Sequence, residues 1–181
     1  MIRYVAFLRG INVGGHAIIK MEALREIFEM PGLKNISTYI QSGNVIFDSK
    51  ETDEASLVKK IEKKLLKDTG KEIKVLLRTM YELAAMVKLN PFGKMKEDKD
   101  TKLYVSFLNE VPGKFPALPY TSPKKDFEVL PIKGREVYYI TYRMANGSYG
   151  NPLIFIEKEY GKGSTSRNWN TIVKILAAFS Q

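Results

Sequence analysis

Residues 35–49 read NISTYIQSGNVIFDS, and this stretch predicts a β-hairpin. Alternating apolar and polar residues predict a strand over 35–41, and the Ser-Gly-Asn triplet at 42–44 supplies the chemistry of a turn. The apolar run at 45–49 then returns as a second strand. The elements on either side of this hairpin determine the fold.

One strand and one helix are predicted on each side of the hairpin. The segment IRYVAFL at 2–8 is rich in β-branched and aromatic residues, which is typical of a strand buried on both faces. Residues 20–30 and 54–69 carry apolar residues at helical spacing, and Gly70 stands where a C-terminal cap belongs. A fourth strand is predicted at 72–78.

The resulting order βαββαβ predicts a ferredoxin-like first subdomain over residues 1–78. Right-handed crossovers and the hairpin predict an antiparallel sheet in the order 4-1-3-2 with both helices on one face. The fold class is therefore α+β.

Residues 79–181 predict a second α+β subdomain. Its proline-rich stretch at 111–123 is too interrupted for a regular element, and Pro131 suggests that the strand containing it lies at an edge. No repeat with a period of about 20–50 residues is visible. The predicted elements are a helix at 80–89 capped by Thr79, a strand at 101–108, a hairpin of 127–132 and 135–142, and helices at 151–160 and 166–179.

Composition disfavours several kinds of chemistry. The 181 residues include no cysteine, which removes disulfides, thiolate metal sites and cysteine nucleophiles. The one histidine, His16, would have to carry any histidine-based triad or metal site alone. We therefore expect neither a metal ion nor a cofactor.

The charge and the hydropathy of the chain bear on its partners and its location. Lys and Arg outnumber Asp and Glu by 29 to 20, which favours phosphate-bearing partners, although the excess is spread thinly along the chain. No apolar run approaches the roughly 20 residues of a membrane span, and the first predicted strand leaves no room for a signal peptide. We expect a cytoplasmic protein without membrane contact.

Strand directions place three loops on one edge of the predicted sheet: residues 10–19, 42–44 and 69–71. Backbone N–H groups at a helix start, glycines that let a ligand approach, and the two-pronged Arg9 donor favour an anion or polar ligand there. The candidate ligand-binding residues on this edge are Arg9, Gly10, Asn12, Gly14, Gly15, Gln41, Ser42 and Asn44.

The glycine loop does not match the known phosphate-binding motifs. Gly10 and Gly15 have the spacing of the P-loop glycines, but His16 and Ala17 stand where the lysine and the hydroxyl residue belong. An alternative interpretation is that the glycines only supply turn geometry and that Arg9 pairs with a nearby carboxylate.

A second polar cluster, GKGSTSRNWN at 161–170, precedes the last predicted helix. One of its three hydroxyl residues, Ser164, Thr165 or Ser166, would be the helix cap. A cap does not account for Arg167 and Asn168, which are further candidate ligand-binding residues. Trp169 is predicted to anchor the core.

Four motifs together resemble a known bacterial family. They are R9-G-I-N-V-G-G15-H, M21-x-x-L-R25, T38-Y-I-Q-S-G-N-V45-x-F47 and R167-N-W-N-T171. The chain is similar in these motifs to the DUF1697 family of bacterial proteins of unknown function. The resemblance implies a two-part α+β protein with a ferredoxin-like first half and brings no established activity. A site shared by both clusters would require the Arg167 segment to dock against the edge that carries Arg9.

Three hypotheses for function follow, and the first is favoured. A small anionic ligand, bearing phosphate or carboxylate, binds at loops 9–16 and 41–44, either in a binding protein or in an enzyme of unassigned type. The second is a nucleic-acid-binding module that stacks bases on Phe7 and Phe47, although the sequence pattern of RNA-binding sheets is absent. The third is a protein-interaction module that uses residues 111–123 or an exposed sheet edge. The oligomeric state is open under all three.

Overall fold

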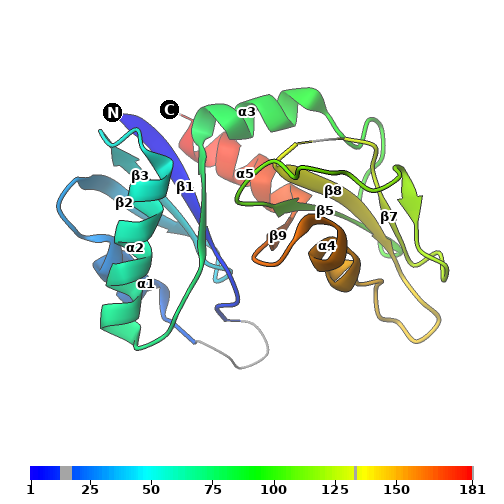
Figure 1. The fold of residues 1–181 in the computed structure, drawn as a ribbon, viewed down its shortest axis with the longest axis horizontal. Helices are drawn as coiled ribbons and strands as arrows, with labels where there is room; N and C mark the ends of the chain where they lie inside the picture. Colours follow the sequence, from blue (N-terminus) through cyan, green and yellow to red (C-terminus); the bar gives the residue numbers. More distant parts are fainter. Residues whose placement is uncertain (13–17, 133, 181) are drawn as a thin grey trace. The chain divides into compact units, whose positions relative to one another are not determined.

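The chain forms two compact units in a computed structural model that describes residues 1–12, 18–132 and 134–180 (Figure 1). Unit 1 comprises Met1–Ala84 with Ile175–Gln181, and unit 2 comprises Ala85–Lys174. The division falls inside two helices, α3 (Met80–Leu89) and α5 (Trp169–Phe179), whereas the sequence placed its boundary between residues 78 and 79. Both units are α+β with antiparallel sheets.

Unit 1 contains the predicted order of elements. Its sheet has the order β2-β3-β1-β4 and every neighbouring pair is antiparallel, so the predicted order 4-1-3-2 is confirmed, while the ferredoxin-like label stays a prediction. The elements are β1 (Ile2–Leu8), α1 (Met21–Phe28), β2 (Leu33–Tyr39), β3 (Asn44–Ser49), α2 (Glu54–Thr69) and β4 (Val75–Thr79).

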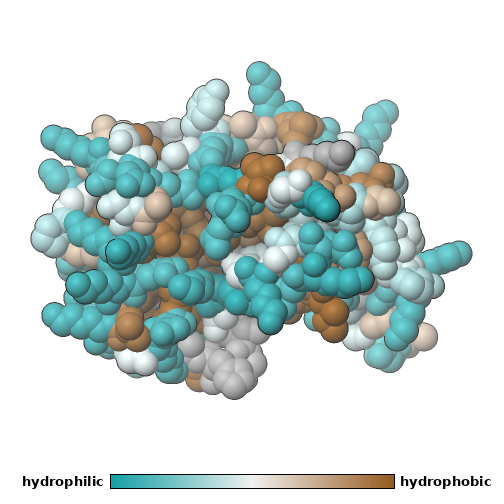
Figure 2. Space-filling view, in the orientation of Figure 1, coloured by the Kyte–Doolittle hydropathy of each residue, from teal (hydrophilic) through white to brown (hydrophobic). Residues whose placement is uncertain are grey.

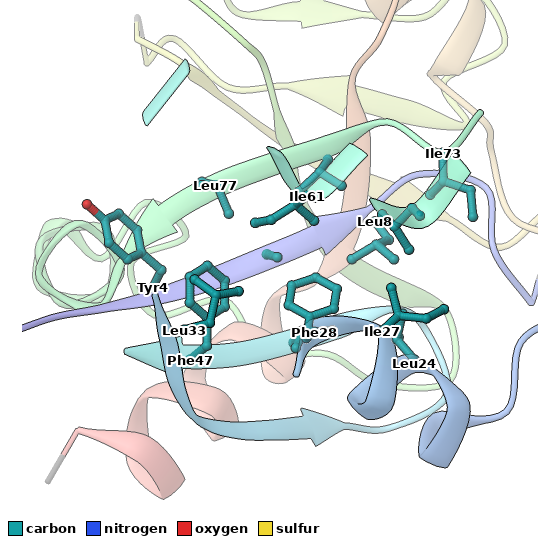
Figure 3. Close-up of a cluster of buried hydrophobic side chains, with 14 of the residues drawn as sticks. Tyr4, Leu8, Leu24, Ile27, Phe28, Leu33, Phe47, Ile61, Ile73 and Leu77 are labelled. Carbon is teal, nitrogen blue, oxygen red and sulfur yellow. The ribbon is translucent and has the colours of Figure 1, made fainter. Parts of the chain in front are cut away.

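Both helices of unit 1 pack on the same face of the sheet (Figure 3). Leu8, Phe47 and Leu77 project from three strands into one cluster with Phe28 of α1 and Ile61 of α2. The Phe47 ring lies 5.7 Å from the ring of Phe28. Burying each of these side chains contributes about 1.5–3 kcal/mol, so this cluster holds the helices to the sheet.

The C-terminal residues belong to unit 1 because they bond to its sheet. The Arg3 guanidinium donates to the backbone oxygen of Phe179 at 2.9 Å. The ring of Phe179 also meets Tyr39 edge-on, with 6.3 Å between centroids. These contacts join residues far apart in the sequence, which is why the predicted second subdomain of 79–181 does not coincide with unit 2.

Unit 2 has a five-stranded sheet in the order β6-β7-β8-β5-β9. The predicted hairpin is present as β7 and β8, but two predictions around it are wrong. The proline-rich stretch does contain a strand, β6, and because β6 pairs with β7 the latter is not an edge strand. Pro131 lies outside β7. The elements are β5 (Thr101–Phe107), β6 (Tyr120–Thr121), β7 (Phe127–Val129), β8 (Glu136–Tyr142), α4 (Leu153–Tyr160) and β9 (Thr165–Asn168).

The last predicted helix begins later than expected. Residues 165–168 form β9, which pairs with β5, and α5 starts only at Trp169. The cap is Asn168, whose Oδ1 accepts from the N–H of Asn170 at 2.9 Å, and not one of the hydroxyl residues. The Ser166 hydroxyl instead reaches Ser106 on β5 at 3.2 Å, so long-range strand pairing overrides the local cap signal.

Unit 2 repeats the plan of unit 1. The strands β7-β8-β5-β9 have the same order and directions as β2-β3-β1-β4, and the central strands carry YVAFL at 4–8 and YVSFL at 104–108. Tyr4 lies opposite Phe47 with stacked rings 5.7 Å apart. At the equivalent position, Tyr104 lies opposite Tyr139 with stacked rings 5.3 Å apart.

The correspondence extends to the edge strands and the helices after them. Arg78 of β4 lies opposite Val5, and Arg167 of β9 lies opposite Val105; both arginines are buried. Each is followed by a capping residue and a helix: Thr79 accepts from the N–H of Glu82 before α3, and Asn168 caps α5. The repeat spans nearly a whole unit, so no short-period pattern reveals it. None of the described helices is both long and apolar enough to cross a membrane.

Candidate functional site

The predicted loops 10–19 and 42–44 meet at one edge of unit 1. The N–H of Leu8 donates to the oxygen of Gly43 in the β2–β3 turn at 2.8 Å. The N–H of Arg9 donates to the oxygen of Lys74, just before β4, at 2.9 Å. The segment that leaves β1 is therefore bonded to the β2–β3 turn and to the residue that precedes β4, and Lys74 lies beyond the predicted loop 69–71.

Asn12 fixes the loop that follows β1. Its Nδ2 donates to the backbone oxygens of Ile19 at 3.0 Å and Gln41 at 2.9 Å, and its Oδ1 accepts from the N–H of Ile19 at 2.8 Å. Both amide protons are thus used within the protein. Asn12 positions the edge, and its side chain is not free to orient a ligand.

Asn44 and Ser42 build the β2–β3 turn. The Asn44 side chain is fully buried and donates to the Tyr39 oxygen at 3.0 Å and to the Ser42 hydroxyl at 2.9 Å. Gly43 between them has a φ of 73°, and a Cβ there would lie 2.7 Å from the side chain of Ile11. These residues give the turn its shape.

A cavity of about 390 Å³ opens beside this edge at the start of α1. The residue that precedes α1, Lys20, is extended and its side chain makes no cap hydrogen bond. The carboxylate of Glu22 pairs with Arg25 at 3.2 Å. The described residues that line the cavity are Asn12, Ile18, Ile19, Lys20, Met21, Glu22 and Gln41.

The remaining candidates on this edge are Arg9 and three glycines. Arg9 is partly exposed directly after β1. Gly10 is exposed with a φ of 69°, and a Cβ there would meet nothing within 4 Å. Gly14 and Gly15 lie outside the described residues, as does His16.

Arg167 is buried in unit 2 on β9. Its guanidinium donates to the Thr165 hydroxyl at 3.0 Å and to the Ser166 oxygen at 2.8 Å. Burial lowers the pKa of Arg167 to about 10, because removal from water disfavours the charged form. Arg9 belongs to unit 1 and Arg167 to unit 2, so a site that holds both stays a prediction.

Asn168 and Asn170 share a partner that the sequence did not reveal. Asn168 Nδ2 donates to Glu97 Oε1 at 2.5 Å, and Asn170 donates to the other oxygen of the same carboxylate. Glu97 also accepts from the N–H of Leu103 at 2.8 Å. This carboxylate lies in a loop of alternating charges, and the sequence gives no signal that singles it out. Trp169 meets the ring of Phe92 at 5.4 Å, as expected of a core anchor.

The two aromatic residues of the base-stacking hypothesis lie on different faces of the sheet. Phe47 belongs to the cluster under α1 and α2, and Phe7 alternates to the opposite face and is buried as well. They cannot form one exposed platform. Among residues 1–12, 18–132 and 134–180, no group of three or more acidic or histidine side chains could hold a metal ion.

Comparison with known proteins places the chain in a family. A search of curated proteins finds no match. Among solved structures, the conserved bacterial protein SP0830 from Streptococcus pneumoniae has a TM-score of 0.67 at 21% identity, with 100% of this chain and 99% of that chain covered, so the fold is shared. The family described as "Protein of unknown function (DUF1697)" matches residues 1–138, which exclude the motif that begins at Arg167. The chain therefore belongs to the DUF1697 family.

Proposed function

We propose that unit 1 binds a small anionic ligand, bearing phosphate or carboxylate, in the cavity at the start of α1. The observation that carries this proposal is the position of that cavity of about 390 Å³, between the edge loops and a helix start without a side-chain cap. Its volume lies within the range of about 300–1,000 Å³ that is usual for small-molecule sites.

The groups around the cavity suit an anion. The first N–H groups of a helix have no partner within the helix and carry partial positive charge, and no side chain of the preceding residue caps α1. Lys20 adds a positive charge, and the side chain of Gln41, which also lines the cavity, can donate hydrogen bonds. The only carboxylate among the described lining residues, Glu22, is paired with Arg25, which reduces its repulsion of an anion.

The residues at this edge then divide into two groups, and they include Lys20, which the sequence did not predict. Lys20 and Gln41 contact the ligand together with the backbone of α1, while Asn12 and the turn formed by Ser42 and Asn44 hold the walls in place. Arg9 and Gly10 stand at the same edge, where Arg9 adds positive charge. The proposed activity of this site is ligand binding.

Thermal unfolding in a panel of ligands tests this proposal. The panel contains inorganic phosphate, nucleoside mono-, di- and triphosphates, and di- and tricarboxylates. A ligand at about ten times its Kd stabilises the folded protein by about 1.4 kcal/mol. In a chain of this size we expect a rise in melting temperature of about 3–6 °C.

Matched variants separate this site from nonspecific attraction to a basic protein. We expect Lys20→Ala and Gln41→Ala to reduce the ligand-induced rise, whereas Lys34→Ala, an exposed lysine on β2, leaves it unchanged. A panel without any stabilising anion, or an equal response of all three variants, would contradict the proposal.

A further inference from the structure

Helix α2 exposes a stripe of lysines directly opposite the face that it buries. Leu57, Ile61 and Leu65 pack into the core of unit 1. Each is followed two residues later by an exposed lysine, and two helical residues correspond to a rotation of about 200°. The three lysines are Lys59, Lys63 and Lys67, and hydrophilic side chains cover this part of unit 1 in Figure 2.

Two of the three carboxylates of α2 pair with lysines outside the stripe. Glu62 pairs with Lys74 at 3.0 Å and accepts from the N–H of Val75 at 2.9 Å. Asp68 pairs with Lys64 at 2.5 Å. Within the part of the chain that the structure describes, the three stripe lysines form no ion pair.

This arrangement acts against the stability of the helix. Lysines four residues apart on a helix are neighbours, so Lys59 repels Lys63, and Lys63 repels Lys67. A surface that needed only solubility could intersperse both signs of charge. The stripe therefore indicates a partner that supplies the missing negative charge.

We propose that the α2 stripe binds the phosphate backbone of nucleic acid without reading its sequence. The stripe is about 12 Å long, because eight residues separate its ends at about 1.5 Å each. A DNA duplex carries one negative charge per about 1.7 Å of axis, so about seven phosphate charges lie along that length. No existing ion pair has to break when the lysines bind.

Two other polyanionic partners fit the helix less well. Helices that lie in a membrane surface insert an apolar face, and the apolar face of α2 is buried against the sheet. An acidic protein would need complementary apolar contacts at the core of its interface, and Leu66 is the one large apolar side chain that α2 exposes. A nucleic-acid backbone requires only regularly spaced cations.

The number of lysine–phosphate contacts predicts how steeply the binding affinity falls with salt concentration. Three lysine–phosphate contacts predict a slope of about −2.7 in a plot of log K against log salt concentration. Affinity should then fall about 40-fold between 50 and 200 mM salt. Each single substitution, such as Lys63→Ala, should make the slope about 0.9 less steep.

The experiment is fluorescence anisotropy of a short random-sequence DNA duplex and a single-stranded RNA titrated with the full chain. The test variant is Lys59→Glu/Lys63→Glu/Lys67→Glu, and glutamate preserves helix propensity. The control is Lys94→Glu/Lys96→Glu/Lys99→Glu on exposed positions of unit 2, which lowers the net charge equally. Circular dichroism verifies that both variants are folded, and the salt slope of Lys63→Ala gives a second reading that does not depend on the triple variant.

We expect the test variant to lose at least tenfold in affinity at 50 mM salt while the control changes less than about threefold. Absence of binding by the unmodified chain would overturn the proposal. Equal loss in both triple variants would also overturn it, since net charge alone would then explain binding. Tighter binding of polyglutamate than of either nucleic acid would assign the stripe to an acidic protein instead.

Discussion

The two units share a scaffold and differ in the connection that leaves their central strand. In unit 1, β1 continues through the edge loop into α1 and the cavity beside it. In unit 2, β5 continues into the proline-rich stretch, which contributes β6 and stacks Tyr120 on Phe155 at 4.0 Å. The shared residues build the sheets, so the candidate site arises from the part that is not repeated.

A second difference lies within the repeated part itself. The cross-strand pair Arg3–Asp48 of unit 1 is an ion pair with 2.8 Å between its closest atoms. The equivalent pair of unit 2 is Leu103–Ile140. Because Arg3 also donates to Phe179, the charged pair of unit 1 helps to hold the C-terminus.

Substitutions in the stacked aromatic pairs should have the largest effect on stability and test whether the two units use equivalent residues in the same way. Phe47→Ala removes a fully buried ring and should lower the free energy of unfolding by about 3–5 kcal/mol. Tyr139→Ala, at the equivalent position, should cost a similar amount. Chemical denaturation measures both, and a loss below about 1 kcal/mol for either one would mean that the pairs do not play equivalent roles.

Substitution of two glycines at the candidate edge should destabilise the protein by clearly different amounts. Gly43→Ala combines a φ of 73° with a close approach to Ile11, and should cost about 2–4 kcal/mol from strain and overpacking together. Gly10→Ala has a similar φ but open space, and should cost about 1 kcal/mol. Urea denaturation of the two variants checks the order; equal losses would show that the packing of Ile11 does not constrain the turn.

The ion pair of unit 1 should make its stability sensitive to acid. Hydrogen bonding to Arg3 holds the pKa of Asp48 below its usual 3.8, so this stabilisation is present above pH 3.8 and is lost as pH falls through the lowered pKa. We expect a loss of about 1–2 kcal/mol at most, because Arg3 is partly exposed.

The double variant Arg3→Leu/Asp48→Ile replaces this ion pair with the apolar pair of leucine and isoleucine found at the equivalent positions of unit 2. Its unfolding free energy should fall less than that of the unmodified chain between about pH 7 and about pH 2.5. An identical acid response of the two proteins in urea denaturation would show that Asp48 is not the group responsible.

Removal of two tyrosine hydroxyls should change the stability of the protein by small amounts of opposite sign. Tyr4 donates to the Glu51 oxygen at 2.8 Å, so Tyr4→Phe should destabilise by about 1 kcal/mol. The Tyr160 hydroxyl is buried without a hydrogen-bond partner among the described residues, and Tyr160→Phe should stabilise by up to about 1 kcal/mol. Thermal melts compare them; destabilisation by Tyr160→Phe would mean that this hydroxyl has a partner in solution.

Local patterns were sufficient to predict the elements of unit 1 from β1 to β4, but not the C-terminal residues that bond to its sheet. The apolar spacing of α2 and the left-handed Gly70 after it, with a φ of 67°, mark that helix without reference to the rest of the chain. The order of the strands followed from right-handed crossover connections and from the single hairpin. The position of β9 could not be predicted, because it depends on pairing with β5, about sixty residues earlier in the sequence.

The candidate site was harder to predict than the fold. Asn12, Asn44 and Asn168 have side chains suited to a ligand, and the same hydrogen-bonding capacity lets them close turns and cap a helix. Whether an amide faces a ligand or the backbone depends on three-dimensional neighbours. Lys20 was not predicted as a site residue. It lines the cavity because α1 starts beside it, and no pattern in the sequence indicates that a cavity lies at this helix start.

The central claim is that the anion site lies at the edge of unit 1. An NMR titration of the isotope-labelled protein with the best-stabilising anion tests it most directly. We predict that amide shifts concentrate at 9–12, 18–22 and 41–44, and that Lys20→Ala weakens them. Shifts confined to unit 2, or spread evenly over the exposed lysines of both units, would contradict the claim.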